Sequence, residues 1–240
     1  LKHVLPLGIS SFLTQVSIVV IMAVMNNVLV IYGAGSKYGA DIPMTVVGIV
    51  MKVFQIVISV VVGIAAGAQP IVGYNYGAGL WRRVKLIFRT MMAAEFSVGL
   101  VSLICFEVFP VQIISVFGSE DGLYNEFAVL AFRVFLGGIV LCCIQKSCSI
   151  FLQSMGKPAL SMLLSLLRDF VLSVPLTLVL PRFFGVTGAL YSGPAADVIS
   201  FGAAVLCMAA VFRKLNRLED GEVALSGASQ RGLAVERKIC

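Results

Sequence analysis

Long apolar stretches, separated by short polar segments, run along almost the whole chain. Six of them are long enough to cross a bilayer, because a membrane-spanning helix needs about 20 mostly apolar residues. The six spans cover roughly residues 4–32, 44–72, 86–109, 124–152, 158–181 and 186–212. The sequence therefore predicts an all-α, polytopic membrane protein in which residues 1–215 form a bundle of six transmembrane helices.

The two ends of the chain depart from this pattern. Residues 216–240 are polar and small, a composition that cannot bury enough apolar surface to order a chain, so we expect a disordered tail. The chain begins at Leu1 instead of Met, and its first apolar stretch is longer than the core of a signal peptide. We therefore expect a fragment or a processed piece of a longer protein.

Composition agrees with membrane insertion and argues against catalysis. Hydrophobic residues make up 59% of the 240 residues and charged residues 12%, whereas soluble domains carry about 25% charged residues. The chain has a single histidine, His3, and lacks the common hydrolase, zinc-protease and phosphate-loop motifs. Its six cysteines show no metal-ligand spacing. We expect no enzyme, no metal site and no nucleic-acid partner.

Charges in the connecting segments sort by side of the membrane. One side collects most of the basic residues, namely Lys2, Arg82, Arg83, Lys85, Arg89, Lys157, Arg213, Lys214 and Arg217. The other side has only Lys37 and Arg182 among basic residues and holds Asp41, Glu107, Glu120, Asp121 and Glu126. Because cytoplasmic loops carry an excess of Lys and Arg, the first side is cytoplasmic. We therefore expect a multi-pass protein of the cell membrane, with both ends of this chain in the cytoplasm.

Seven charged residues fall in the interior of the predicted spans, away from the span ends. They are Lys52, Glu95, Arg133, Lys146, Arg168, Asp169 and Asp197. Each costs about 2.5–3.5 kcal/mol at the centre of a transmembrane helix, so such residues are functional candidates by default. Four are basic and three acidic, so they can partly neutralise one another.

Polar residues form a stripe on each of the first two spans. On the second span, Lys52, Gln55, Ser59, Gly63 and Gln69 lie within about 60° on either side of one line. This stripe either packs against another helix through small residues or lines a cavity. On the first span, Gln15 and Asn26 share a face. They either hydrogen-bond between helices or face a cavity.

The fifth and sixth spans carry the most specific candidates. Ser161, Ser165, Asp169 and Ser173 recur every four residues, which makes Asp169 the best candidate for a cation or proton site. Arg168 points about 100° away from Asp169, so we do not expect a simple pair between them.

On the sixth span, Pro194 precedes Asp197 by three residues. A proline there kinks the helix and frees a carbonyl near the carboxylate. The alternative is a purely structural pair between Asp197 and Arg133 or Lys52.

Several short motifs, in register along about residues 1–215, resemble one known family. Residues 67–79 read Gly-Ala-Gln-Pro-Ile-Val-Gly-Tyr-Asn-Tyr-Gly-Ala-Gly and are followed by Arg83 and Val84. Further similar segments are 151–157, 164–169, 175–181, 185–188 and 194–197. Together they are similar to the eighth and the tenth to twelfth helices of multidrug and toxic compound extrusion (MATE) transporters.

This resemblance implies a fold and a function. MATE transporters have twelve spans in two six-helix bundles around a central cavity, so the chain is expected to be the C-terminal bundle, with an N-terminal six-helix half as its partner. They export organic cations and drugs in exchange for Na⁺ or H⁺, without a cofactor. Some use acidic residues in the seventh and tenth helices for the ion, but the corresponding spans here, the first and fourth, contain no such residue within the membrane.

The resulting hypothesis is half of an antiporter embedded in membrane lipid and acting on small molecules. Its expected pathway residues are Asp169 and Asp197 as carboxylates, Asn26, Gln55 and Gln69 as substrate-facing amides, and Lys52 and Arg133 as charge partners. One alternative is a flippase for a lipid-linked oligosaccharide, because four intramembrane basic residues suit an anionic pyrophosphate. Another is a receptor or scaffold without transport activity.

Overall fold

The structure is a computed structural model that describes the backbone of residues 5–117 and 122–239, and side chains within residues 12–220 of these ranges. Helices account for nearly all of this part of the chain. They are α1 (Leu5–Ala34), α2 (Asp41–Gly77), α3 (Trp81–Val108), α4 (Pro110–Ser115), α5 (Gly122–Leu136), α6 (Ile139–Ser154), α7 (Pro158–Leu166), the π-helix η1 (Leu167–Leu172), α8 (Ser173–Phe184) and α9 (Val186–Ile239). No strand occurs among the described residues.

These helices make six segments that are long and apolar enough to span a membrane. Within the part of the chain whose side chains are described, the segments are Gln15–Ala34, Asp41–Gly77, Trp81–Val108, Gly122–Ser154, Pro158–Phe184 and Val186–Asp220. The predicted all-α bundle of six transmembrane helices is confirmed. Two of the segments are interrupted, since α5 and α6 stack end to end as one span, and α7, η1 and α8 form another.

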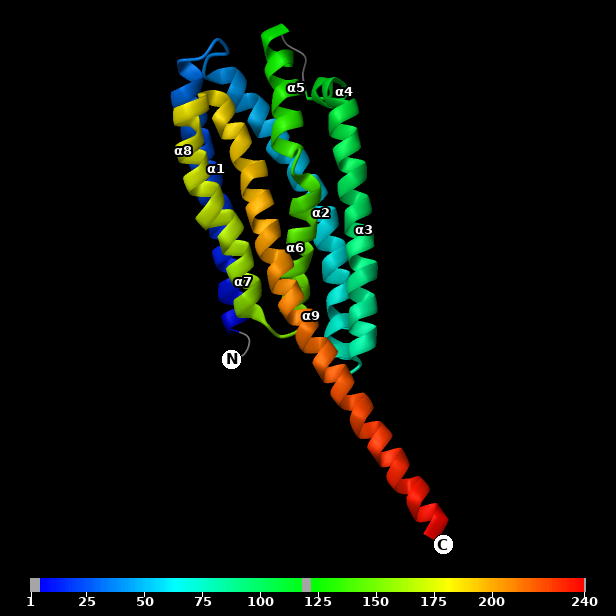
Figure 1. The fold of residues 1–240 in the computed structure, drawn as a ribbon. Coiled ribbons are helices and arrows are strands. Elements are labelled where there is room, and N and C mark those ends of the chain that lie inside the picture. The colour runs from blue at the N-terminus through cyan, green and yellow to red at the C-terminus, as the bar shows by residue number, and fades with distance from the viewer. Residues whose placement is uncertain (1–4, 118–121, 240) are drawn as a thin grey trace.

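The connections alternate between the two ends of the bundle, as the charge pattern requires. The turn between α2 and α3 and the turn between α6 and α7 lie at the end where α1 begins, while α4 and the turn between α8 and α9 lie at the other end (Figure 1). The basic cluster at the start of α3 therefore shares an end with Lys157. The cytoplasmic orientation of that end stays a prediction.

The last helix extends past the predicted bundle. In the structure α9 continues as one helix to Ile239 and projects beyond the bundle (Figure 1), and the disorder expected for residues 216–240 stays a prediction. Helix propagation from an ordered preceding turn costs little, because each added residue forms one further backbone hydrogen bond. The boundary of the membrane bundle near residue 215 stays a prediction.

The helices pack on two apolar clusters that hold the bundle together. One contains Phe127, Phe132 and Leu190, and the other contains Phe151 and Leu215. Packing is closest where α8 turns into α9. A Cβ atom on Gly188 would lie 2.4 Å from the carbonyl oxygen of Leu180, so only glycine lets these two helices meet. The interrupted fifth span and the sixth span are thereby held close together where α8 meets α9.

Candidate functional site

The fifth span changes its helical pitch where its charged residues lie. Residues Leu167–Leu172 form a π-helix, and the backbone N–H of Ser173 donates to the carbonyl oxygen of Arg168. The Ser173 hydroxyl donates to the same oxygen over 2.8 Å, and Gln145 Nε2 donates to the Leu164 carbonyl over 3.1 Å. Such π turns interrupt regular helices mostly at functional positions. Here side chains bond to one carbonyl group inside the π-helix and to another in the turn before it.

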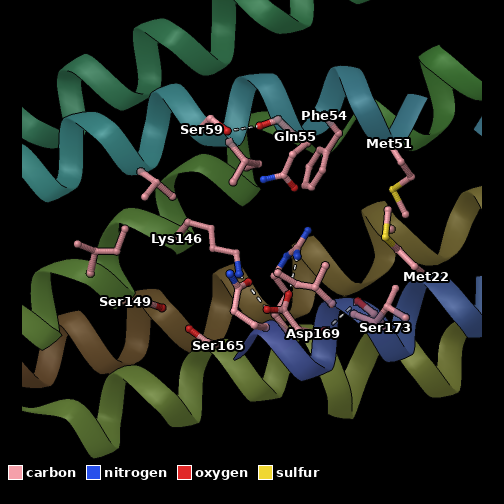
Figure 2. A pocket seen from close by; sticks show the side chains of 18 of the residues that line it. Met22, Met51, Phe54, Gln55, Ser59, Lys146, Ser149, Ser165, Asp169 and Ser173 are labelled. Atoms are coloured by element: carbon pink, nitrogen blue, oxygen red, sulfur yellow. Dashed lines mark hydrogen bonds and ion pairs between the residues drawn. The ribbon is translucent and has the colours of Figure 1, made fainter. Parts of the chain in front are cut away.

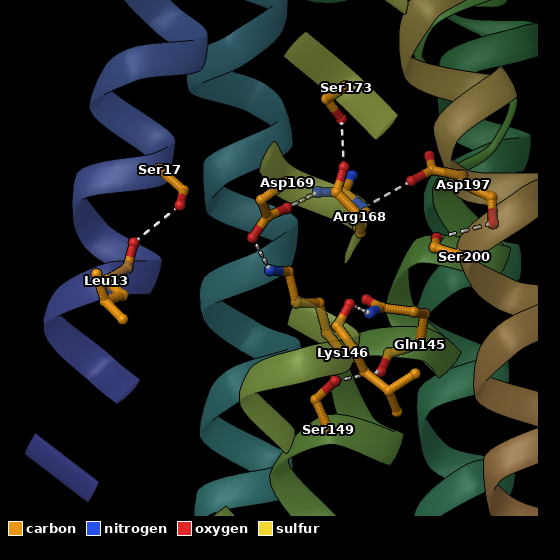
Figure 3. Close-up of polar contacts among 11 residues, drawn as sticks. Leu13, Ser17, Gln145, Lys146, Ser149, Arg168, Asp169, Ser173, Asp197 and Ser200 are labelled. Atoms are coloured by element: carbon orange, nitrogen blue, oxygen red, sulfur yellow. Dashed lines mark hydrogen bonds and ion pairs between the residues drawn. The ribbon is translucent and has the colours of Figure 1, made fainter. Parts of the chain in front are cut away.

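Four charged side chains meet at this turn. Lys146 Nζ on α6 lies 2.9 Å from Asp169 Oδ2, an Arg168 Nη lies 2.7 Å from Asp169 Oδ1, and Arg168 Nε lies 2.8 Å from Asp197 Oδ1 on α9 (Figure 3). The two carboxylates are only 2% and 4% exposed. Two positive and two negative groups balance, which reduces the cost of burying them together. We call these four residues the charge network.

The charge network corrects two expectations from the sequence. Arg168 and Asp169 do pair, although they are neighbours on the helix, because the long arginine side chain reaches both carboxylates with different nitrogens. Asp197 pairs with Arg168 instead of Arg133 or Lys52. Arg133 is exposed and lies 3.5 Å from Glu107, and Lys52 is exposed on α2.

A glycine and a proline make room for Asp197. Between α5 and α6, a Cβ atom on Gly138 would lie 2.8 Å from Asp197 Oδ2 and 3.2 Å from Pro194 Cα. Pro194 lies inside α9 and cannot donate a backbone hydrogen bond to the preceding turn. The break in the fourth span and the proline of the sixth therefore meet at one carboxylate. Both features are visible in the sequence, but their proximity is not.

The charge network borders a cavity of about 650 Å³. Its walls come from α1, α2, α6, the fifth span and the start of α9. Phe54 and Gln55 of α2 face Lys146 and Asp169 across it (Figure 2). The Arg168 guanidinium lies 5.8 Å from the centre of the Phe54 ring, within the range of a cation–π interaction. Apolar walls with a few convergent polar groups are typical of small-molecule sites.

The cavity explains the polar stripe on α2. Gln55, Ser59 and Gly63 line it, whereas Lys52 and Gln69 do not. Cβ atoms on Gly63 and Gly67 would meet no other atom within 4 Å, so the stripe is not a tight helix-packing seam within this chain. On α1, Gln15 lines the cavity, but Asn26 is exposed and does not.

One group of cavity residues was not recognised as a joint face from the sequence, although Lys146 in it was among the seven intramembrane charges. Lys146, Ser149 and Gln153 share one face of α6 and line the cavity together. Their spacing of three and four residues is the signal that could have identified this face. Met22 and Met51 also line it, and their sequence positions give no such signal.

The charge network limits how a cation could bind. Each oxygen of Asp169 already accepts a hydrogen bond from Lys146 or Arg168. No group of three or more His, Cys, Asp or Glu residues arranged to hold a metal ion occurs among the described residues. A metal cation or proton that reaches Asp169 therefore competes with two basic side chains for the charge of the carboxylate.

Comparison with known proteins identifies the family. The MatE family model matches residues 8–179, which is more than half of the chain. The chain belongs to the MatE family. This confirms the resemblance to MATE transporters that the sequence motifs indicated.

Curated relatives and solved structures agree with this assignment. The chain is 22% identical over 209 residues to the multidrug export protein MepA of Staphylococcus aureus strains NCTC 8325 / PS 47 and N315, which covers 86% of this chain and 44% of MepA. In fold it is similar to a MATE transporter in an outward-facing conformation (TM-score 0.79, 18% identity, 89% of this chain and 47% of the other). Its TM-score with a MATE transporter in an inward-facing conformation is 0.76, at 18% sequence identity, and the match covers 88% of this chain and 47% of the other. The chain spans somewhat less than half the length of these proteins.

Proposed function

We propose that this chain is one half of a secondary transporter that exports organic cations or drugs in exchange for Na⁺ or H⁺. The observation that carries this proposal is the cavity of about 650 Å³ with a buried carboxylate, Asp169, at its wall, in a member of the MatE family. The second half would be a further six-helix bundle. Rocking of two such bundles exposes a midplane site alternately to each side.

The cavity walls suit an amphipathic cation. Met22, Met51 and Phe54 provide polarizable and aromatic contacts, while Gln15 and Gln55 provide amide groups. Asp169 supplies the negative charge. Exporting a cation against the membrane potential costs about 2.3 kcal/mol per charge and 100 mV, so this half needs coupling to an ion gradient.

Exchange of partners at Asp169 offers a way to couple the two ions. In the present arrangement Lys146 and Arg168 neutralise Asp169. A proton or Na⁺ arriving at the carboxylate would release at least one of these basic side chains, and the released cation would repel a bound organic cation in the adjacent cavity. Substrate and coupling ion would therefore bind in turn.

Export by the full-length transporter containing Asp169→Asn tests this role. We expect at least a tenfold loss of dye efflux at an unchanged amount of protein in the membrane. Asp41→Asn is the matched control, because Asp41 is exposed in the first turn of α2 and does not line the cavity. Unchanged efflux in Asp169→Asn would remove Asp169 from the mechanism.

The flippase alternative is less well supported by the charges. It relied on four intramembrane basic residues, of which Lys146 and Arg168 bond to carboxylates and Arg133 lies near Glu107. A deletion strain separates the two functions, since it accumulates dye if the protein is an efflux transporter and lipid-linked precursors if it is a flippase. Absence of any gradient-dependent transport would instead favour a receptor or scaffold.

A further inference from the structure

One carboxyl group lies outside the charge network and has no role in the proposed export cycle. Glu95, near the middle of α3, is completely buried. Neither of its carboxyl oxygens has a partner at ordinary hydrogen-bond geometry, and, among the described residues, the side chain that interacts with the carboxyl group is the equally buried hydroxyl of Ser147 on α6. A buried polar group without a partner is rare in proteins and calls for an explanation.

The helices next to Glu95 pack closely. One turn further along α3, a Cβ atom on Gly99 would lie 3.1 Å from Val140 Cα and 3.5 Å from Cys143 Sγ. Glu95 does not line the cavity beside the charge network. A Na⁺ ion needs several oxygen ligands, whereas a proton needs only one carboxyl oxygen.

The charged side chains of the neighbouring helices do not neutralise Glu95. The titratable group that faces it from α6 is the Cys143 thiol, and Lys146 on the same helix bonds to Asp169.

The other helices that pack on α3 are α2, α4, α5 and α9. The charged groups on them whose side chains the structure describes are exposed or bonded elsewhere; they are Asp41 and Lys52 on α2, Glu126 and Arg133 on α5, and Asp197, Arg213, Lys214, Arg217, Glu219 and Asp220 on α9. An ionised Glu95 would thus be an isolated buried charge, which costs several kcal/mol.

We propose that Glu95 is a proton-binding site between α3 and α6. In the packed arrangement the carboxyl group is a neutral acid, whose O–H can donate to the Ser147 hydroxyl. When the two helices separate and water enters, the O–H bond breaks, the proton passes to water, and the carboxylate remains. Rebinding of a proton restores the packed interface. A role of this proton in drug export would rest on the proposed function, whereas proton binding by Glu95 does not depend on that function.

Infrared difference spectroscopy of the full-length transporter in lipid nanodiscs tests the proposal. At neutral pH we expect a carbonyl band of a protonated carboxylic acid that is absent in Glu95→Gln. Glu107→Gln is the control on the same helix, because Glu107 is about half exposed and lies near Arg133, and it should keep the band. An identical spectrum in Glu95→Gln, or loss of the wild-type band on adding Na⁺ at constant pH, would overturn the proposal.

A second measurement does not depend on assigning a band. Because the folded interface holds a proton that the unfolded chain releases at neutral pH, wild-type thermal stability should fall as pH rises, and this fall should be smaller in Glu95→Gln. Glu95→Met gives the same comparison where the amide variant does not accumulate. Equal pH dependence in the wild type and the variant would contradict the proposal. Efflux by Asp169→Asn tests the export function separately, so either idea can fail alone.

Discussion

Carboxyl groups are buried in two regions of this bundle, and the two regions are built in opposite ways. Around η1, Asp169 and Asp197 accept hydrogen bonds from Lys146 and Arg168 beside a cavity. Between α3 and α6, Glu95 has no charged partner among the described residues and does not line that cavity, and the Ser147 hydroxyl is the side chain that interacts with it. In the first region each buried carboxylate is neutralised by a basic side chain. In the second region no basic side chain that the structure describes is available, so we expect the carboxyl group to be uncharged.

The backbone explains why the regions differ. The charge network lies where three spans are irregular, at the π turn, at Gly138 between α5 and α6, and at Pro194 in α9. Irregular backbone inside a membrane needs polar groups or water nearby to satisfy it. By contrast, α3 is unbroken and packs closely on α6 at Gly99. Regular helices at close contact exclude water, so only an uncharged carboxyl group is compatible with that interface.

Removing Arg168 should give the largest effect. Arg168→Met leaves Asp197 buried without its partner, and breaking a buried pair in this way costs about 3–5 kcal/mol. Glu95→Gln leaves no charge behind and should cost under about 1 kcal/mol. Thermal unfolding of both variants of the full-length transporter measures the contrast.

A second substitution separates lost charge balance from lost packing. Adding Asp197→Asn to Arg168→Met removes the isolated carboxylate and should restore part of the stability. Equal destabilisation by Arg168→Met and Glu95→Gln would mean that the two regions do not differ in the way their charges are held.

The next effect concerns the glycines that shape the two regions. Gly138→Ala places a methyl group against Asp197 and the Pro194 backbone, and Gly99→Ala places one against Val140 and Cys143. Overpacking of this kind costs about 1–3 kcal/mol. We expect the first variant to lower efflux, because it displaces the charge network, and the second to shift the infrared band of Glu95.

Gly202→Ala on α9 is the matched control for both glycine variants. A Cβ atom there meets no atom within 4 Å, so stability should stay the same or rise by up to about 1 kcal/mol through better helix propensity. An efflux defect in Gly202→Ala as large as that in Gly138→Ala would contradict the contrast between a crowded and an open glycine.

Much of the fold could be predicted from sequence, and less of the site. Apolar length and loop charge sufficed for six spans, because bilayer thickness sets helix length almost independently of packing. The seven intramembrane charges were recognisable one by one, but their pairing was not. Arg168 reaches Asp197 on another helix, and only the three-dimensional packing decides which helices are neighbours. The π turn likewise leaves no periodic signal, since Ser161, Ser165, Asp169 and Ser173 follow the spacing of an ordinary α-helix.

The smallest effect should come from an ion pair outside both regions. Lys37 Nζ lies 2.7 Å from Glu126 Oε1, with side chains 59% and 55% exposed, and exposed pairs contribute little because water screens them. Lys37→Met should therefore leave thermal stability nearly unchanged, and the small difference should shrink at high salt. The hydrogen bond to Glu126 raises the pKa of Lys37 above its usual 10.5. Any stabilisation from this pair is thus fully present below pH 10.5, the usual pKa of lysine, and is lost as the pH rises through the raised pKa of Lys37 in the folded protein. A loss comparable to that in Arg168→Met would show that burial is not what makes the charge network strong.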